Sequence, residues 1–112
     1  MTRGAYVTRD AWAQLDTDSR YRARVKGVAA LSRHSLVFSH HSAAALWRLP
    51  IVGSWPSQVH VIVNRSGGGR SSASVARHTV GVPAVLDIID GLTVTTLART
   101  VVDCAKLLKF GP

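Results

Sequence analysis

Short apolar runs of strand length, separated by helical segments, constrain the fold of this chain most. In Val59–Val63 three valines occupy alternate positions, which predicts a strand with one firmly apolar face. Segment 88–94 places an Asp-Gly pair between apolar residues, a sequence typical of a two-residue β-hairpin. Two further runs are predicted as a short strand or buried turn (36–38) and as a strand that returns along the first one (75–80).

Helical spacing of apolar residues fills the intervals between these strands. Asp16 is expected to cap a helix over Ser19–Leu31, and its apolar positions form one stripe: Tyr21, Val25, Val28 and Ala29. Thr95 or Thr96 is expected to cap a last helix with a similar stripe: Leu97, Val101, Cys104 or Ala105, and Leu108. A short helix is also predicted over 9–15. This order of elements predicts an α+β fold with a small, mainly antiparallel sheet and packed helices.

Positive charge is the sharpest feature of the composition. The 112 residues include 14 Lys and Arg against six acidic residues, all Asp, for a net charge of +8. The first 70 residues hold ten of the basic residues and three Asp. Such a basic half favours a polyanionic partner such as nucleic acid, although a GC-rich genome or a merely solvated helix face gives the same pattern. If nucleic acid binds, we expect contacts from six residues: Arg20, Arg22, Arg24, Lys26, Arg65 and Arg70.

The chain carries no sign of export or of a membrane span. No apolar run approaches the roughly 20 residues that a membrane helix needs, and the N-terminal segment lacks a signal-peptide core. The single cysteine, Cys104, excludes an internal disulfide and a Cys-rich zinc site. We therefore expect a cytoplasmic protein with no membrane partner.

Two adjacent histidines raise the question of a metal site. Neighbouring residues of a helix point about 100° apart, so His40 and His41 cannot easily share one ion. His60 and His78 lie on separate predicted strands and can join one of them. Because no Cys, Glu or nearby Asp completes a ligand set, we expect no metal and no cofactor.

The same segment is better explained as the start of a helix. The Gly-x-Ser-x-Gly elbow of a serine nucleophile is absent around Ser39 and Ser42. The side chain of Ser39 is instead expected to accept a backbone N–H and cap the helix. The three alanines at 43–45 favour helix and allow a neighbouring element to approach closely. The helix is expected to end at Leu49, before Pro50.

No other segment carries a catalytic pattern. The glycine-rich segment 66–70 lacks the Gly-Lys-Ser/Thr of a phosphate-binding P-loop and is more typical of a hairpin tip. Asp87 and Asp90 share a loop in which nothing activates them. Arg99 and Asp103, spaced i, i+4, predict a surface or partly buried ion pair. We expect no catalytic residue and no enzymatic activity.

Several segments, taken in order, resemble one known family. Segment 3–7 (RGAYV) resembles the end of a winged-helix wing. SHHSAAALWRLP and DGLTVTTLARTVVDCA resemble the "SHxSAAxLxGLP" and "GLPVTSPxRTLxDLA" segments of AbiEi-type antitoxins from bacterial type IV toxin–antitoxin systems, and VHVIVNRSGGGR with VARH lies between them, where that family has two strands and a basic loop. Six residues within these segments form the structural motif that the resemblance implies: Ser39, His40, Ser42, Thr95, Arg99 and Asp103.

The resemblance implies a non-enzymatic antitoxin or transcriptional regulator that binds DNA and opposes a nucleotidyltransferase-type toxin. It assigns 1–7 to the remnant of a wing, with the winged helix truncated, and 8–112 to an AbiEi-like α+β domain. Two alternatives stay open. The first is an accessory domain of a very-short-patch-repair-like endonuclease family protein, and the second is an inactive gene remnant.

Overall fold

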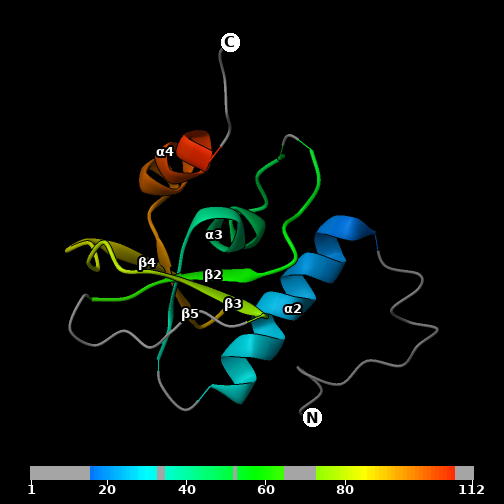
Figure 1. The fold of residues 1–112 in the computed structure, drawn as a ribbon, viewed down its shortest axis with the longest axis horizontal. Helices are drawn as coiled ribbons and strands as arrows, with labels where there is room; N and C mark the ends of the chain where they lie inside the picture. The colour runs from blue at the N-terminus through cyan, green and yellow to red at the C-terminus, as the bar shows by residue number, and fades with distance from the viewer. Residues whose placement is uncertain (1–15, 33–34, 52, 65–72, 108–112) are drawn as a thin grey trace.

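The structure, a computed structural model, describes residues 16–32, 35–51, 53–64 and 73–107. They form a five-stranded sheet with α2 (Thr17–Leu31) and α3 (His40–Leu46) packed against it and α4 (Leu97–Leu107) packed on α3. The strands are β1 (Val37–Phe38), β2 (Val59–Ile62), β3 (Val75–His78), β4 (Leu86–Ile89) and β5 (Leu92–Thr95) (Figure 1). The predicted α+β class is confirmed. The predictions for the wing segment 1–7, the helix 9–15, Arg65 and Arg70 lie outside the described residues.

The sheet is mixed and has the order β3-β2-β1-β5-β4. β1 pairs antiparallel with β2, and β4 with β5, whereas β1–β5 and β2–β3 are parallel pairs. The prediction that 75–80 returns along 59–63 as a hairpin is therefore wrong. Twelve residues separate β2 from β3, and about a dozen are enough for the crossover that a parallel pair needs.

The predicted Asp-Gly hairpin is confirmed. β4 and β5 pair antiparallel, and the turn residues Asp90 and Gly91 have φ of 52° and 79°. Both values lie in the left-handed region that a type I′ turn requires and that Gly and Asp tolerate best. The turn sets the register in which Ile89 lies opposite Leu92.

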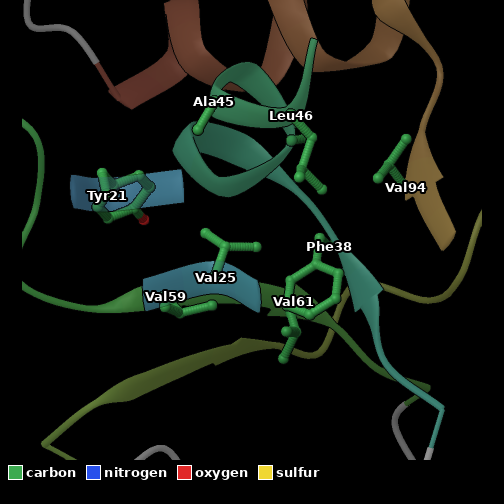
Figure 2. Packing of buried hydrophobic residues seen from close by; sticks show 9 residues of the cluster. Tyr21, Val25, Phe38, Ala45, Leu46, Val59, Val61 and Val94 are labelled. Atoms are coloured by element: carbon green, nitrogen blue, oxygen red, sulfur yellow. The ribbon is translucent and has the colours of Figure 1, made fainter. Parts of the chain in front are cut away.

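The core lies between α2, α3 and the sheet (Figure 2). The predicted stripe of α2 is confirmed, because Tyr21 and Val25 are buried and Val28 and Ala29 pack against the core. The strands contribute Phe38, Val59, Val61 and Val94, and α3 contributes Ala43, Ala45 and Leu46. Burying each Val or Leu side chain contributes roughly 1.5–3 kcal/mol, so these few contacts hold α2 and α3 against the sheet.

Side-chain caps fix where α2 and α4 begin. Asp16 is the N-cap of α2, as predicted, and its Oδ1 accepts the Ser19 N–H at 2.7 Å. Of the two threonines considered for α4, Thr96 provides the cap, because its Oγ1 accepts the Arg99 N–H at 3.2 Å. Thr95 is the last residue of β5. None of the described helices is long and apolar enough to cross a membrane.

α3 ends earlier than predicted. It stops at Leu46, with Trp47 as its C-cap, rather than at Leu49. Arg48 has φ of 59°, a left-handed conformation that ends a helix because the next residues no longer continue the hydrogen-bond ladder. Pro50 therefore follows a turn and does not itself end the helix.

The predicted packing face of α4 is wrong. Leu97 and Val101 of the apolar stripe are 43% and 51% exposed, whereas Thr100 and Asp103 are 0% and 2% exposed. α4 packs on α3 with this polar face, and the buried hydroxyl is hydrogen-bonded: Thr100 Oγ1 is 2.8 Å from Thr95 Oγ1 and donates to the Thr96 carbonyl at 2.7 Å. The buried face of α4 is therefore polar, and its buried hydroxyl and carboxylate both have hydrogen-bond partners.

Candidate functional site

Ser39 precedes α3, but its side chain does not cap the helix as predicted. Ser39 Oγ lies 2.8 Å from His40 Nδ1, and no side-chain cap hydrogen bond forms. The backbone carbonyl of Ser39 instead accepts the N–H groups of Ser42 and Ala43 at 3.0 and 3.1 Å. The Ser39 hydroxyl is therefore hydrogen-bonded to the His40 imidazole and not to a backbone N–H of the helix.

Ser42 connects three elements of the fold. Its Oγ accepts the backbone N–H of His60 at 2.8 Å and lies 3.0 Å from the Tyr21 hydroxyl. Tyr21 donates its one proton to the Gln58 carbonyl at 2.7 Å, so Ser42 is the donor to Tyr21. Burial raises the pKa of Tyr21 from 10.0 to about 12, so the hydroxyl stays protonated further into the alkaline range than that of an exposed tyrosine.

The two segments that carry the family resemblance meet through α3, β5 and α4. Trp47 Nε1, at the end of α3, donates to the carbonyl of Thr95 at 3.0 Å. Within α4, Arg99 Nε donates to both Asp103 oxygens at 2.9 and 3.0 Å. This confirms the predicted ion pair, and its carboxylate side chain is only 3% exposed. These residues form a structural framework.

The structure brings three histidines together. His40 opens α3, His60 lies in β2 and His78 ends β3. In the parallel β2–β3 register Ile62 pairs with His78 and His60 with Ala76, so His60 and His78 share one face. His60 Nδ1 lies 2.8 Å from His78 Nε2, and the His40 ring stacks on the His78 ring at 3.9 Å.

This histidine cluster is arranged as a set of three nitrogen donors. One ring nitrogen from each of His40, His60 and His78 lies within 4.8 Å of the other two. His41 is not a member of this set. The sequence placed His60 and His78 on separate strands. The sequence did not predict that these two strands pair in parallel. The prediction of a returning, antiparallel strand over 75–80 gave a different register and so did not bring the two histidines together.

Burial keeps the cluster neutral near pH 7. Desolvation lowers the pKa of both His40 and His60 to about 4, and lowers the pKa of His78. The Asp103 carboxylate acts in the opposite direction on His40 and His78. Neutral imidazoles each keep one ring nitrogen with a free lone pair, which can accept a hydrogen bond or bind a metal ion.

The four basic residues predicted on α2 divide between two sides of the helix. Arg20 and Arg24, spaced i, i+4, line a groove on one side. Arg22 Nη2 donates to Ser19 Oγ at 3.1 Å, and Lys26 Nζ pairs with Asp90 Oδ2 at 3.2 Å at the β4–β5 turn. The four basic residues of α2 therefore form two basic edges, and one of them borders a groove.

The groove has an aromatic wall that the sequence did not single out. Trp55 stacks on Tyr21 with ring centroids 4.8 Å apart and planes 11° from parallel, and its Nε1 donates to Asp18 Oδ1 at 2.7 Å. Arg24 lies 5.8 Å from the Tyr21 ring and donates to the Ser57 carbonyl. The groove, of about 520 Å³, extends from α2 to the segment 50–55. Trp55 fell in a predicted loop, where no periodicity marks a functional side chain.

Comparison with known proteins finds no matching family model, no matching curated protein and no matching solved structure.

Proposed function

We propose that this chain is a non-enzymatic, cytoplasmic regulator domain of the AbiEi-antitoxin type, and that it acts by binding nucleic acid in the groove beside α2. The resemblance of two segments to that family supports the proposal. It is also supported by the contact between these segments, in which Trp47 Nε1 donates to the Thr95 carbonyl. In that family the antitoxin opposes a nucleotidyltransferase-type toxin, and we propose the same role here.

The observation that carries the proposal is the composition of the groove. Two arginines, Arg20 and Arg24, line a cavity that is also lined by Trp55. Guanidinium groups neutralise phosphates, and a fixed aromatic ring offers a stacking surface to any base. Asp18 also lines the groove, and its hydrogen bond to the indole holds the Trp55 ring in place.

The net charge of the whole chain also supports binding of nucleic acid. A chain with a net charge of +8 attracts polyanions from a distance and speeds their association. Arg24 is exposed, so its charge is accessible at the groove. The ion pair between Lys26 and Asp90 offsets charge on the other edge of α2, as the Asp18 carboxylate does at the groove. The cavity and the Trp55 ring therefore distinguish the groove edge as the site for nucleic acid.

Salt-dependent binding tests this proposal. Full-length chain would be titrated into fluorescently labelled duplex and single-stranded oligonucleotides, and anisotropy recorded over a series of salt concentrations. Each phosphate that is neutralised adds about −0.9 to the log–log slope on duplex DNA and about −0.7 on single strands. Replacing both Arg20 and Arg24 with Gln is expected to reduce the slope by roughly two such contacts.

A matched pair on the same helix is the control. Arg22→Gln with Lys26→Gln removes the same charge from the opposite edge, and we expect a smaller loss of affinity. Equal losses for the two pairs would place binding outside the groove. Affinity that does not depend on salt, or no affinity for any oligonucleotide, would refute nucleic-acid binding altogether.

A further inference from the structure

We propose that His40, His60 and His78 form a binding site for a divalent transition-metal ion, with zinc as the best match to the ligands. The three side chains come from the start of α3, from β2 and from β3, and one ring nitrogen of each lies within 4.8 Å of the others. Imidazole nitrogen is a preferred ligand of zinc, and three histidines leave one coordination position for water.

Ser39 orients one of the ligands. Its Oγ lies 2.8 Å from His40 Nδ1, which leaves Nε2 as the nitrogen available to the ion. A histidine that binds a metal usually donates its second ring N–H to a neighbouring acceptor, which fixes the tautomer and the ring orientation. Ser39 is 0% exposed, so this hydrogen bond does not compete with water.

The backbone of His40 has an uncommon conformation, which is typical of functional sites. His40 has φ of 53°, in the left-handed region that few residues other than Gly adopt, with Asn, Asp and His the most frequent among them. Such conformations persist where the surrounding structure holds them, and they are concentrated at functional sites. Here the strained residue is also the one whose ring stacks on His78.

Metal binding requires the rings to rotate. A ring nitrogen points its lone pair in the ring plane, and the His40 and His78 rings are only 17° from parallel. Zinc–nitrogen bonds of about 2.0–2.1 Å place tetrahedral ligands roughly 3.4 Å apart. The hydrogen bond of 2.8 Å between His60 and His78 must therefore open, while the wider separations in the cluster must close.

Direct titration tests the site. Full-length chain without an affinity tag would be treated with chelator and titrated with Zn²⁺ by calorimetry, and with Co²⁺ to detect tetrahedral coordination by visible absorption. We expect one ion per chain. His60→Asn and His78→Asn should each weaken binding by at least about 100-fold, and Ser39→Ala by about 10-fold to 100-fold.

His41→Asn is the matched control, because His41 is adjacent in sequence to a proposed ligand but outside the cluster. It should leave the affinity for Zn²⁺ within about threefold of that of the parent chain. Replacing a group that orients a metal ligand typically lowers the affinity by about 10-fold to 100-fold. Unchanged affinity in His60→Asn and His78→Asn, or an equal loss in His41→Asn, would overturn the proposal.

A measurement on the unmodified chain avoids dependence on variants that fail to fold. Nitrogen NMR of the imidazole rings during a Zn²⁺ titration should shift the resonances of three histidines and leave those of His41 in place. The absence of shifts at His40, His60 and His78 would equally refute the site.

Discussion

The hydrogen bonds that join α2, α3 and β2 predict a specific energetic coupling between Tyr21 and Ser42. Tyr21→Phe removes a hydroxyl that donates to the Gln58 carbonyl and accepts from Ser42. Each such bond contributes about 0.5–1.5 kcal/mol net, so the free energy of unfolding should fall by about 2 kcal/mol. The ring itself is 1% exposed and keeps its packing in the Phe variant.

Ser42→Ala should cost a similar amount, because it removes the same bond to Tyr21 and the acceptor for the His60 N–H. The two substitutions share one hydrogen bond. The double variant should therefore lose about 1 kcal/mol less than the two single losses added together. Urea unfolding followed by tryptophan fluorescence measures all four proteins, and the slope with urea should stay constant.

An exposed serine provides the control. Ser54 is exposed, and Ser54→Ala should change the free energy of unfolding by less than about 0.5 kcal/mol. A loss in Tyr21→Phe no larger than that of the control, or strictly additive losses in the double variant, would refute the account of Ser42 as the junction of three elements.

Two further predictions concern ionisable groups. Burial raises the pKa of Tyr21 from 10.0 to about 12, so its contribution is fully present below pH 10 and is lost as the pH rises through 12. Compared with Tyr21→Phe, the parent chain should lose about 3 kcal/mol over this range, measured by urea unfolding at each pH; parallel pH profiles of the two proteins would contradict the assignment. Asp103→Asn leaves the Arg99 guanidinium without its carboxylate, and since Arg99 is 35% exposed the loss should be about 2–3 kcal/mol, below the 3–5 kcal/mol of a fully buried pair. Exposed Asp87→Asn is the control for that measurement, and equal effects would show that the pair contributes nothing.

Local signals in the sequence predicted the helices, the caps and the turn. The direction in which the strands pair depends on contacts between distant residues, and the sequence did not predict it. The Asp90-Gly91 turn, the Asp16 cap and the Tyr21–Val25 stripe depend on neighbours within a few residues, and all three are found as predicted. The direction of β3 depends on how the chain crosses from one strand to the next. A glycine-rich segment is compatible with either direction.

In the candidate sites, too, local interactions were predictable from the sequence and long-range ones were not. The ion pair of Arg99 and Asp103 is local and was predictable. The buried face of α4 was not, because α4 packs on α3 through Thr100 and Asp103, and polar residues leave no apolar period in the sequence. The histidine cluster needs the parallel register that places His60 and His78 on one face.

The position of β3 at the edge of the sheet has a consequence for motion. An edge strand pairs on one side only, and local opening commonly begins at such weakly held elements. If β3 detaches from β2, His78 leaves the other two histidines. An ion held by all three would therefore oppose this opening directly, and hydrogen exchange at the amides of Val75–His78 would slow more than exchange in the central strand β1.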